Sequence, residues 1–284
     1  MKVVCTEKSQ ILGVRIADEL GVPVADTRFS QFPDGELYLQ VTGSLDDETI
    51  IVGSVTDNNA LIQLMLLIDA CETTTNTLVI PYLGYARQDK KFREGEPLSA
   101  RVAARALSRG VSDIITVNIH EPEIARYFDA PAHDLSLAAE VGTYIGEQGL
   151  SDPLILAPDA GAAEFAGEIA AVGGWHADYL KKTRLSGEEV RMEPKSFEVR
   201  GREVVIVDDI ISTGGTLATA TGMLYEQGAA AVHAACVHGV FTGGAYVRLR
   251  AAGVKSLVCS DTIERACSSI SAARTIAAAL RKCS

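Results

Sequence analysis

The sequence has no apolar run long enough to cross a membrane. Its longest apolar stretch, residues 60–71, is interrupted by Gln63 and Asp69, whereas a transmembrane helix needs about 20 predominantly apolar residues. The N-terminal residues lead directly into a strand pattern and lack the apolar core and cleavage site of a secretory signal. We therefore expect a cytoplasmic protein that does not bind membranes.

Closely spaced cysteine pairs are also absent. The six cysteines are too scattered for the short spacings of zinc sites and redox motifs, so we expect buried, reduced thiols. They are Cys5, Cys71, Cys236, Cys259, Cys267 and Cys283.

Positive charge is scarce. Lysine and arginine number 26 against 37 aspartates and glutamates, which gives a formal net charge of −11. This charge would repel a nucleic-acid backbone, so we expect no nucleic-acid partner. Basic residues nevertheless gather at 87–93 and at 181–184. Each cluster is either a solvated charged loop or a site for a small anion.

Short apolar runs alternate with amphipathic stretches along most of the chain, which predicts parallel strands joined by crossover helices. With 284 residues, the chain is long enough for two domains. We predict an α/β protein of two similar doubly wound domains with central parallel sheets, at 1–137 and 138–284. The predicted strands are 2–5, 49–55, 77–80, 114–117, 154–157, 204–207, 231–237 and 257–259, and the predicted helices are 11–20, 60–71, 98–109, 138–148 and 216–227.

Two segments depart from this alternation and have the pattern of β-hairpins. One covers residues 25–41, with a turn at 33–36. The other covers residues 183–199, with a turn at 186–188. Either hairpin would extend a sheet or form an interface.

The segment 208–216 reads Asp-Asp-Ile-Ile-Ser-Thr-Gly-Gly-Thr. It follows the apolar run 204–207, which is typical of a strand buried on both faces of a parallel sheet. A helical pattern starts at Thr216, so we expect a loop at the carboxyl edge of the sheet, where open α/β sheets bind ligands.

The residue types in this segment suit a phosphorylated sugar. Gly214 and Gly215 let backbone N–H groups approach an anion at a helix N-terminus, and hydroxyls come from Ser212, Thr213 and Thr216. The paired carboxylates Asp208 and Asp209 would repel a phosphate but accept hydrogen bonds from the hydroxyls of a sugar. An ordinary capped strand–turn–helix junction would not call for two carboxylates directly before it. We therefore expect a bound ribose phosphate.

This segment resembles the ribose-phosphate-binding signature of the type I phosphoribosyltransferase fold. Together with Phe-Pro-Asp-Gly-Glu at 32–36 and Tyr-Ala-Arg-Gln-Asp-Lys-Lys at 85–91, it resembles ribose-phosphate pyrophosphokinases over nearly the whole chain. The resemblance implies two phosphoribosyltransferase-like domains and a homo-oligomer, either a dimer or a multiple of dimers. It also implies Mg²⁺-dependent transfer of a diphosphoryl group from ATP to ribose 5-phosphate, giving 5-phosphoribosyl 1-diphosphate and AMP for nucleotide biosynthesis.

The resemblance places the ATP site in the first half of the chain. The turn would contribute from a neighbouring subunit, with Phe32 near the base, and the run 90–97 would be a mobile catalytic loop. Taken alone, Pro-Asp-Gly is a favourable turn sequence, and the charged run is a surface loop, which is compatible with a lid. The implied ATP-binding residues are Phe32, Asp34, Gly35, Glu36, Arg87, Gln88 and Asp89.

The second half would bind ribose 5-phosphate and supply the catalytic cations. Lys182 and Arg184 resemble the residues that stabilise charge during phosphoryl transfer, and Lys181 remains the alternative to Lys182. The ribose 5-phosphate residues would be Arg184, Asp208, Asp209, Ser212, Thr213, Gly214, Gly215 and Thr216.

His120 and Asp159 each follow a predicted strand and resemble the family's magnesium-linked residues. Imidazole is a poor direct ligand for Mg²⁺, so we expect His120 to act partly through water or on phosphate oxygens. Without the resemblance, such a histidine is usually structural and Asp159 is a helix cap.

Two other functions fit part of the pattern. A phosphoribosyltransferase uses the same phosphate loop but needs neither Arg87 and Gln88 nor the turn at 34–36. A non-catalytic regulatory relative would need none of the catalytic and metal-linked residues. Phosphate activation and nucleotide feedback stay open.

Overall fold

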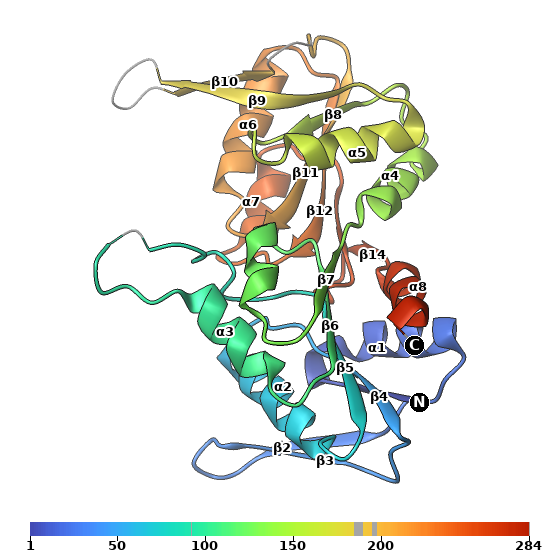
Figure 1. Ribbon diagram of the computed structural model, residues 1–284. Helices are drawn as coiled ribbons and strands as arrows, with labels where there is room; N and C mark the ends of the chain where they lie inside the picture. The colour runs from blue at the N-terminus through green and yellow to red at the C-terminus, as the bar shows by residue number, and fades with distance from the viewer. Residues whose placement is uncertain (92, 185–189, 195–197, 284) are drawn as a thin grey trace. The chain divides into compact units, whose positions relative to one another are not determined.

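The computed structural model describes residues 1–91, 93–184, 190–194 and 198–283, and the predicted turn at 186–188 lies outside them. The chain forms two compact units (Figure 1). Unit 1 contains Met1–Ser136, Asp261–Glu264 and the C-terminal segment from Ser271, and unit 2 contains Leu137–Ser260 and Arg265–Ile270. The domain limits 1–137 and 138–284 stay a prediction, and the units differ from that linear division in the placement of the C-terminal segment.

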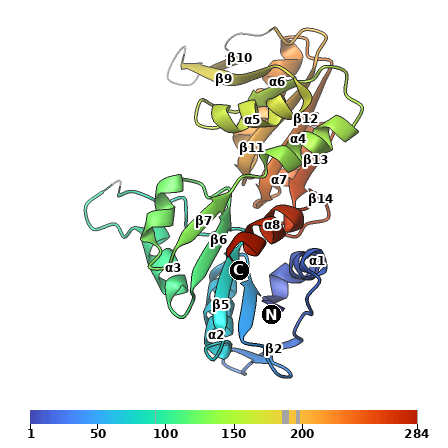
Figure 2. The same ribbon diagram turned by 45° about the vertical axis from the view of Figure 1, so that its right-hand side comes forward.

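Unit 1 is built on a five-stranded parallel sheet with the order β1-β4-β5-β6-β7. Helices α2 and α3 cover one face, where Ile51, Leu78 and Ile114 form the core with them, and α1 and α8 lie side by side on the other (Figures 1 and 2). A separate antiparallel hairpin, β2–β3, confirms the prediction for residues 25–41. The elements are β1 (Lys2–Cys5), η1 (Glu7–Ser9), α1 (Gln10–Leu20), β2 (Thr27–Gln31), β3 (Leu37–Val41), β4 (Glu48–Val52), α2 (Asn58–Ala70), β5 (Thr75–Ile80), α3 (Ser99–Ser108), β6 (Asp113–Val117), η2 (Pro122–Tyr127), β7 (Ala132–Leu135) and α8 (Ala273–Cys283).

Unit 2 is built on a seven-stranded sheet with the order β10-β9-β8-β11-β12-β13-β14, in which only the pairing of β9 with β10 is antiparallel. Alternate residues of β11 point to opposite faces. Val204 and Ile206 pack in the core that includes α6 and α7, and Val205 and Val207 pack in the core that includes α4 and α5. The elements are α4 (Ala138–Glu147), β8 (Leu154–Ala157), α5 (Ala163–Gly173), β9 (Ala177–Arg184), β10 (Val190–Pro194), β11 (Glu203–Ile211), α6 (Gly215–Glu226), β12 (Ala231–Gly239), α7 (Ala245–Ala251), β13 (Leu257–Ser260) and β14 (Ser268–Ile270).

Both units therefore confirm the predicted α/β class, because each has a largely parallel sheet with helices on both faces. Within the described part of the chain, no helix combines the length and the apolar character needed to span a bilayer.

Candidate functional site

The predicted ribose-phosphate segment begins inside a strand. β11 continues to Ile211 because β12 continues beside it, so that Asp208 pairs with Cys236 and Ile211 pairs with Gly239. Only residues 212–214 form the turn, and α6 begins at Gly215. The prediction of a loop from residue 208 is therefore wrong for its first four residues, since the neighbouring strand supplies backbone hydrogen bonds whatever the side chains are.

The turn itself needs its two glycines for different reasons. Gly214 caps α6 in the left-handed region, at φ +69°, and a Cβ there would lie 3.1 Å from Leu249 Cγ. Gly215 is exposed, and the nearest neighbour of a Cβ there would be Thr213 Oγ1 at 4.0 Å. The turn therefore leaves the first backbone N–H groups of α6 open to an anion, which the helix dipole favours.

The segment that follows β12 holds the turn in place through hydrogen bonds. The backbone N–H groups of Phe241 and Thr242 donate to the carbonyl oxygens of Ile211 and Ser212, both at 3.1 Å. Ser212 Oγ lies 3.3 Å from Thr242 Oγ1, and the Arg248 guanidinium donates to the Thr213 carbonyl. Sequence reasoning missed Thr242 and Arg248.

A signal for this support was present in the sequence. Thr-Gly-Gly at 242–244 follows strand β12 just as Thr-Gly-Gly at 213–215 follows β11. Two such turns after neighbouring strands of one parallel sheet lie at the same edge.

Three carboxylates gather at this edge of unit 2. Burial, together with the negative charges of Asp209 and Asp159, raises the pKa of Asp208 to about 8. Asp208 Oδ1 accepts a hydrogen bond of 3.0 Å from the backbone N–H of Asp209, and Asp159 Oδ1 accepts one of 2.8 Å from Gly161. This concentration of negative charge favours binding of a cation or of hydroxyl donors.

The carboxylates fit Mg²⁺ only with further ligands. Among the residues that the structure describes, no three His, Cys, Asp or Glu side chains are grouped to hold a metal. Mg²⁺ commonly keeps several waters and takes one or two carboxylates together with substrate phosphates. Asp159 and Asp208 suit such a site, in which most ligands come from substrate and water.

The backbone of Lys182 and Arg184 lies in β9, which pairs with β8 on one side and β10 on the other. Their side chains lie outside the described part of the structure. The side chain of Lys181 is exposed. The choice between Lys181 and Lys182 stays open.

In unit 1, the predicted ATP-binding turn lies at the tip of the β2–β3 hairpin. The N–H of Phe32 donates to the Glu36 carbonyl at 2.8 Å, and Gly35, at φ +94°, donates to the Phe32 carbonyl at 2.9 Å. The ring of Phe32 is 51% exposed and meets the Tyr38 ring edge to face at 5.9 Å. An aromatic ring held this far into solvent is available to stack on a base.

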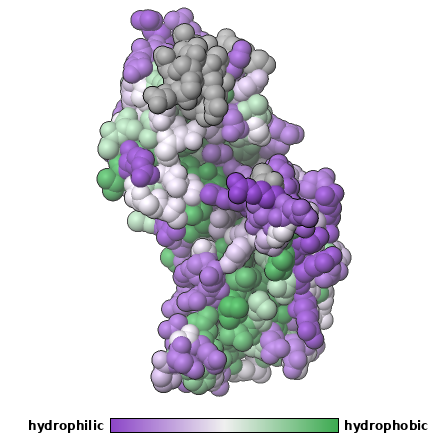
Figure 3. Space-filling view, turned by 90° about the vertical axis from the view of Figure 1, so that its left-hand side faces the viewer, coloured by the Kyte–Doolittle hydropathy of each residue, from purple (hydrophilic) through white to green (hydrophobic). Residues whose placement is uncertain are grey.

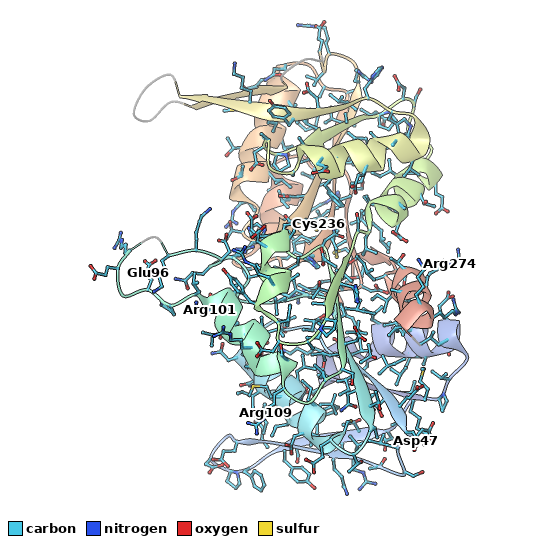
Figure 4. All side chains as sticks on the ribbon, viewed as in Figure 1. Asp47, Glu96, Arg101, Arg109, Cys236 and Arg274 are labelled. Atoms are coloured by element: carbon cyan, nitrogen blue, oxygen red, sulfur yellow. The ribbon has the colours of Figure 1, made fainter. Side chains whose placement is uncertain are left out.

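The segment after β5 that carries Arg87, Gln88 and Asp89 is irregular but tied to its neighbours. The Gln88 carbonyl accepts from the N–H of Ala100 at 3.3 Å, and the Asp89 carbonyl accepts from the Tyr127 hydroxyl at 3.5 Å. Arg87 is exposed. Figure 4 shows Glu96 on the outer part of the following loop, before Arg101 on α3.

His120 follows β6 and is exposed. The residue before it, Ile119, donates its N–H to both oxygens of Asp134, at 3.0 and 3.2 Å. Asp134 also accepts a 2.7 Å hydrogen bond from Thr116 Oγ1, and burial raises its pKa. Sequence reasoning missed this carboxylate, because no strand was predicted at 132–135, where β7 forms.

The structure brings some of the predicted ATP residues together and separates others. Arg87 and His120 follow the adjacent parallel strands β5 and β6, so they share one edge of the sheet. The hairpin that carries Phe32, Asp34, Gly35 and Glu36 is a separate two-stranded sheet that packs against α2 (Figures 1 and 2).

Comparison with known proteins gives a consistent result along the chain. Residues 1–110 match a family model described as the N-terminal domain of ribose phosphate pyrophosphokinase, and residues 136–272 match the phosphoribosyl transferase domain. The chain is 47% identical over 285 residues to the ribose-phosphate pyrophosphokinase of Methanosarcina acetivorans, which covers 99% of this chain and 100% of that one. It is 40% identical over 291 residues to the enzyme of the same name from Methanopyrus kandleri, with 100% of both covered.

A solved structure is similar over the same length. The phosphoribosylpyrophosphate synthetase from Mycobacterium smegmatis superposes with a TM-score of 0.85 at 28% identity, covering 99% of this chain and 98% of that chain.

Proposed function

The chain belongs to the ribose-phosphate pyrophosphokinase family, and we propose which of its residues bind each substrate and which stabilise the reaction. The reaction transfers the β,γ-diphosphoryl group of ATP to the 1-hydroxyl of ribose 5-phosphate, and gives 5-phosphoribosyl 1-diphosphate and AMP. The hydroxyl oxygen attacks the β-phosphorus, the bond from the β-phosphorus to the bridging oxygen of AMP breaks, and the proton of the hydroxyl is released.

The turn at 212–214 with the N-terminus of α6 would hold the 5-phosphate. This proposal depends on one observation: the N-terminus of α6 has no side-chain cap, and the turn before it directly follows the strand β11 that carries Asp208 and Asp209. The phosphate would bind to the N–H groups and to the hydroxyls of Ser212, Thr213 and Thr216, and the ribose hydroxyls would donate to the carboxylates.

Lys182 and Arg184 would stabilise the negative charge that develops on the transferred group. Asp159, with Asp208, would bind Mg²⁺ beside the ribose, and His120 would act near the nucleotide phosphates, partly through water. When bound, Mg²⁺ neutralises phosphate charge and aligns the substrates.

Arg87, Gln88 and Asp89 would bind ATP from the edge of the unit 1 sheet, and the charged run 90–97 would close over it. Phe32, Asp34, Gly35 and Glu36 would contact ATP bound to a second subunit. The exposed ring of Phe32 at the tip of a separate two-stranded sheet supports this arrangement, because such a tip is available to a second subunit.

An apolar surface on unit 1 also supports a homo-oligomer. Figure 3 shows apolar side chains gathered over the lower part of one face. On α2, Ile62, Met65 and Leu66 are 46%, 38% and 36% exposed, and Val102 on α3 is 60% exposed. Contiguous exposed apolar side chains commonly mark an interface. If they do so here, Met65→Glu should lower the mass measured by light scattering, whereas Lys181→Glu should not.

A cytoplasmic location is also part of the proposal. The cysteines at 5, 71, 236, 259 and 267 are free thiols, and persistent disulfides are typical of oxidising compartments. Fractionation of cells that make the protein would check the location.

A direct assay separates the proposed reaction from its rival. Incubation with ATP, ribose 5-phosphate and Mg²⁺ should produce AMP and 5-phosphoribosyl 1-diphosphate in equal amounts without any base. A phosphoribosyltransferase would instead release diphosphate from 5-phosphoribosyl 1-diphosphate, and only when a base is added. That second outcome, with no AMP in the first assay, would overturn the proposal.

A further inference from the structure

Two cysteines that are eight positions apart in the sequence lie side by side in unit 2. Cys259 is in β13 and Cys267 directly precedes β14, and parallel pairing of these strands brings their Sγ atoms to 3.6 Å. The N–H of Cys259 donates to the carbonyl of Cys267 at 3.1 Å, which fixes the two backbones together. The sequence spacing of eight positions does not reveal this proximity, which comes from the pairing of β13 with β14.

The two thiols differ in accessibility and in acidity. Cys259 is fully buried, whereas Cys267 is partly exposed. A hydrogen bond from Cys259, together with the positive charge of Arg265, lowers the pKa of Cys267 to about 7. A substantial fraction of Cys267 is therefore thiolate at neutral pH, and the thiolate is the reactive form.

We propose that Cys259 and Cys267 form a reversible redox site, in which Cys267 reacts with a hydroperoxide and Cys259 then closes a disulfide. Cys267 thiolate attacks one peroxide oxygen, the O–O bond breaks, and a sulfenic acid and hydroxide or an alkoxide result. Cys259 gives up its proton and attacks the sulfenic sulfur, and water leaves. Two electrons pass from the thiols to the peroxide, and a dithiol reductant reverses the process.

Proximity and burial favour a disulfide between Cys259 and Cys267 over one that involves another cysteine. Closing the gap from 3.6 Å to a disulfide length of about 2.05 Å requires a movement of about 1.5 Å, which side-chain rotation and a small backbone shift supply. Cys236, which is labelled in Figure 4, is the register partner of Cys259 on β12. It is fully buried, and burial holds its pKa well above the usual range. Burial also raises the pKa of Cys5 and Cys71 to about 11.

Packing and hydrogen bonds connect the two cysteines to the turn that would hold the sugar phosphate. A Cβ at Gly239 would lie 2.7 Å from Cys259 Sγ, so this sulfur packs directly on the end of β12. Arg265, two residues before Cys267, donates to the carbonyls of Gly239 and Val240, both at 3.0 Å. The next residue, Phe241, donates its N–H to the carbonyl of Ile211, directly before the turn.

A disulfide would therefore move the segment that Arg265 uses to hold β12, and would loosen the phosphate turn. The expected consequence is a KM for ribose 5-phosphate that rises several-fold, with little change in the KM for ATP. This consequence rests on the proposed function of the turn, whereas formation of the disulfide does not.

The test uses the reduced, full-length protein treated with hydrogen peroxide. Intact mass should fall by two hydrogen atoms, and a digest made after alkylation should contain a peptide that joins Cys259 to Cys267. Dithiothreitol should restore both the mass and the KM. Cys267→Ser should abolish this change, and Cys71→Ser, a matched buried control, should retain it.

Several results would overturn the inference. Oxidation of Cys267 to a sulfinic acid without cross-linking, or a disulfide to Cys236, would overturn the redox pair. A disulfide between Cys259 and Cys267 with unchanged KM for ribose 5-phosphate would overturn its connection to the turn. Failure of the reduced protein to form AMP would instead refute the proposed function, and the mass measurement would still decide the disulfide.

Discussion

Replacing the two glycines of the phosphate turn one at a time should separate folding from binding. Gly214 is at φ +69° and has Leu249 Cγ 3.1 Å from the place of a Cβ. The left-handed region costs an alanine about 1–2 kcal/mol, so Gly214→Ala should lower the Tm of unfolding by about 2–8 °C. A rise in the KM of this variant for ribose 5-phosphate would therefore occur together with a lower Tm.

Gly215→Ala should have the opposite signature. A Cβ there meets nothing closer than 4.0 Å, so the fold accommodates it, and the Tm should stay near that of the unmodified protein. The added methyl group would occupy the space through which a phosphate oxygen approaches the backbone. Losing one hydrogen bond to a charged group costs about 1.5–3 kcal/mol, which raises the KM for ribose 5-phosphate roughly tenfold to a hundredfold.

Gly222→Ala is the matched control, because Gly222 lies within α6 and a Cβ there has no neighbour within 4 Å. It should stabilise the helix by about 0.5–1 kcal/mol and leave the KM unchanged. Steady-state kinetics and thermal unfolding of the three variants are the measurements. An unchanged KM in Gly215→Ala would refute the idea that phosphate binds to this backbone.

Three further predictions concern single side chains. Lys182→Ala should lower kcat by about a hundredfold or more with little change in circular dichroism, whereas Lys181→Ala should not; the reverse result would exchange their roles. Because burial raises the pKa of Asp208 to about 8, the folded state loses stability from this group as the pH rises from about 4 through about 8. Asp208→Asn should therefore raise the Tm of the ligand-free protein more at pH 8 than at pH 5, and a gain that is equal at both pH values would contradict this. Phe32→Ala should raise the KM for ATP at constant Tm, since the ring is 51% exposed, and Phe32→Leu should recover the binding only in part.

The sequence was sufficient to predict the fold class and the position of the turn before α6. Continuous apolar runs such as 204–207 become buried parallel strands because helices cover both faces of the sheet. The helix after the turn begins at Gly215, one residue from its predicted start. These features depend on local periodicity and on glycine chemistry, which a single sequence displays.

Features that depend on contacts between distant segments could not be predicted in this way. Asp208 lies in a strand because β12 continues alongside β11, and the two cysteines meet because β14 pairs with β13. Helix α8 packs against α1 at the other end of the chain, and Asp134 holds the residue before His120 from the next strand. In each case the partner is chosen by the tertiary structure, which overrides local preference.

The proposed binding of an anionic sugar phosphate is compatible with a net charge of −11, because the surroundings of Asp208 disfavour its charged form. The anion would interact with uncharged backbone N–H groups at the end of α6, whose field is local and does not depend on net charge. Asp208 is instead held in surroundings that disfavour its charged form, through burial and the nearby charges of Asp209 and Asp159. Sugar hydroxyls or a divalent cation favour the charged form, so binding them offsets an unfavourable interaction that is already present in the free protein. A carboxylate with an unfavourable charged form lowers the stability of the free protein, and such groups are typical of functional sites.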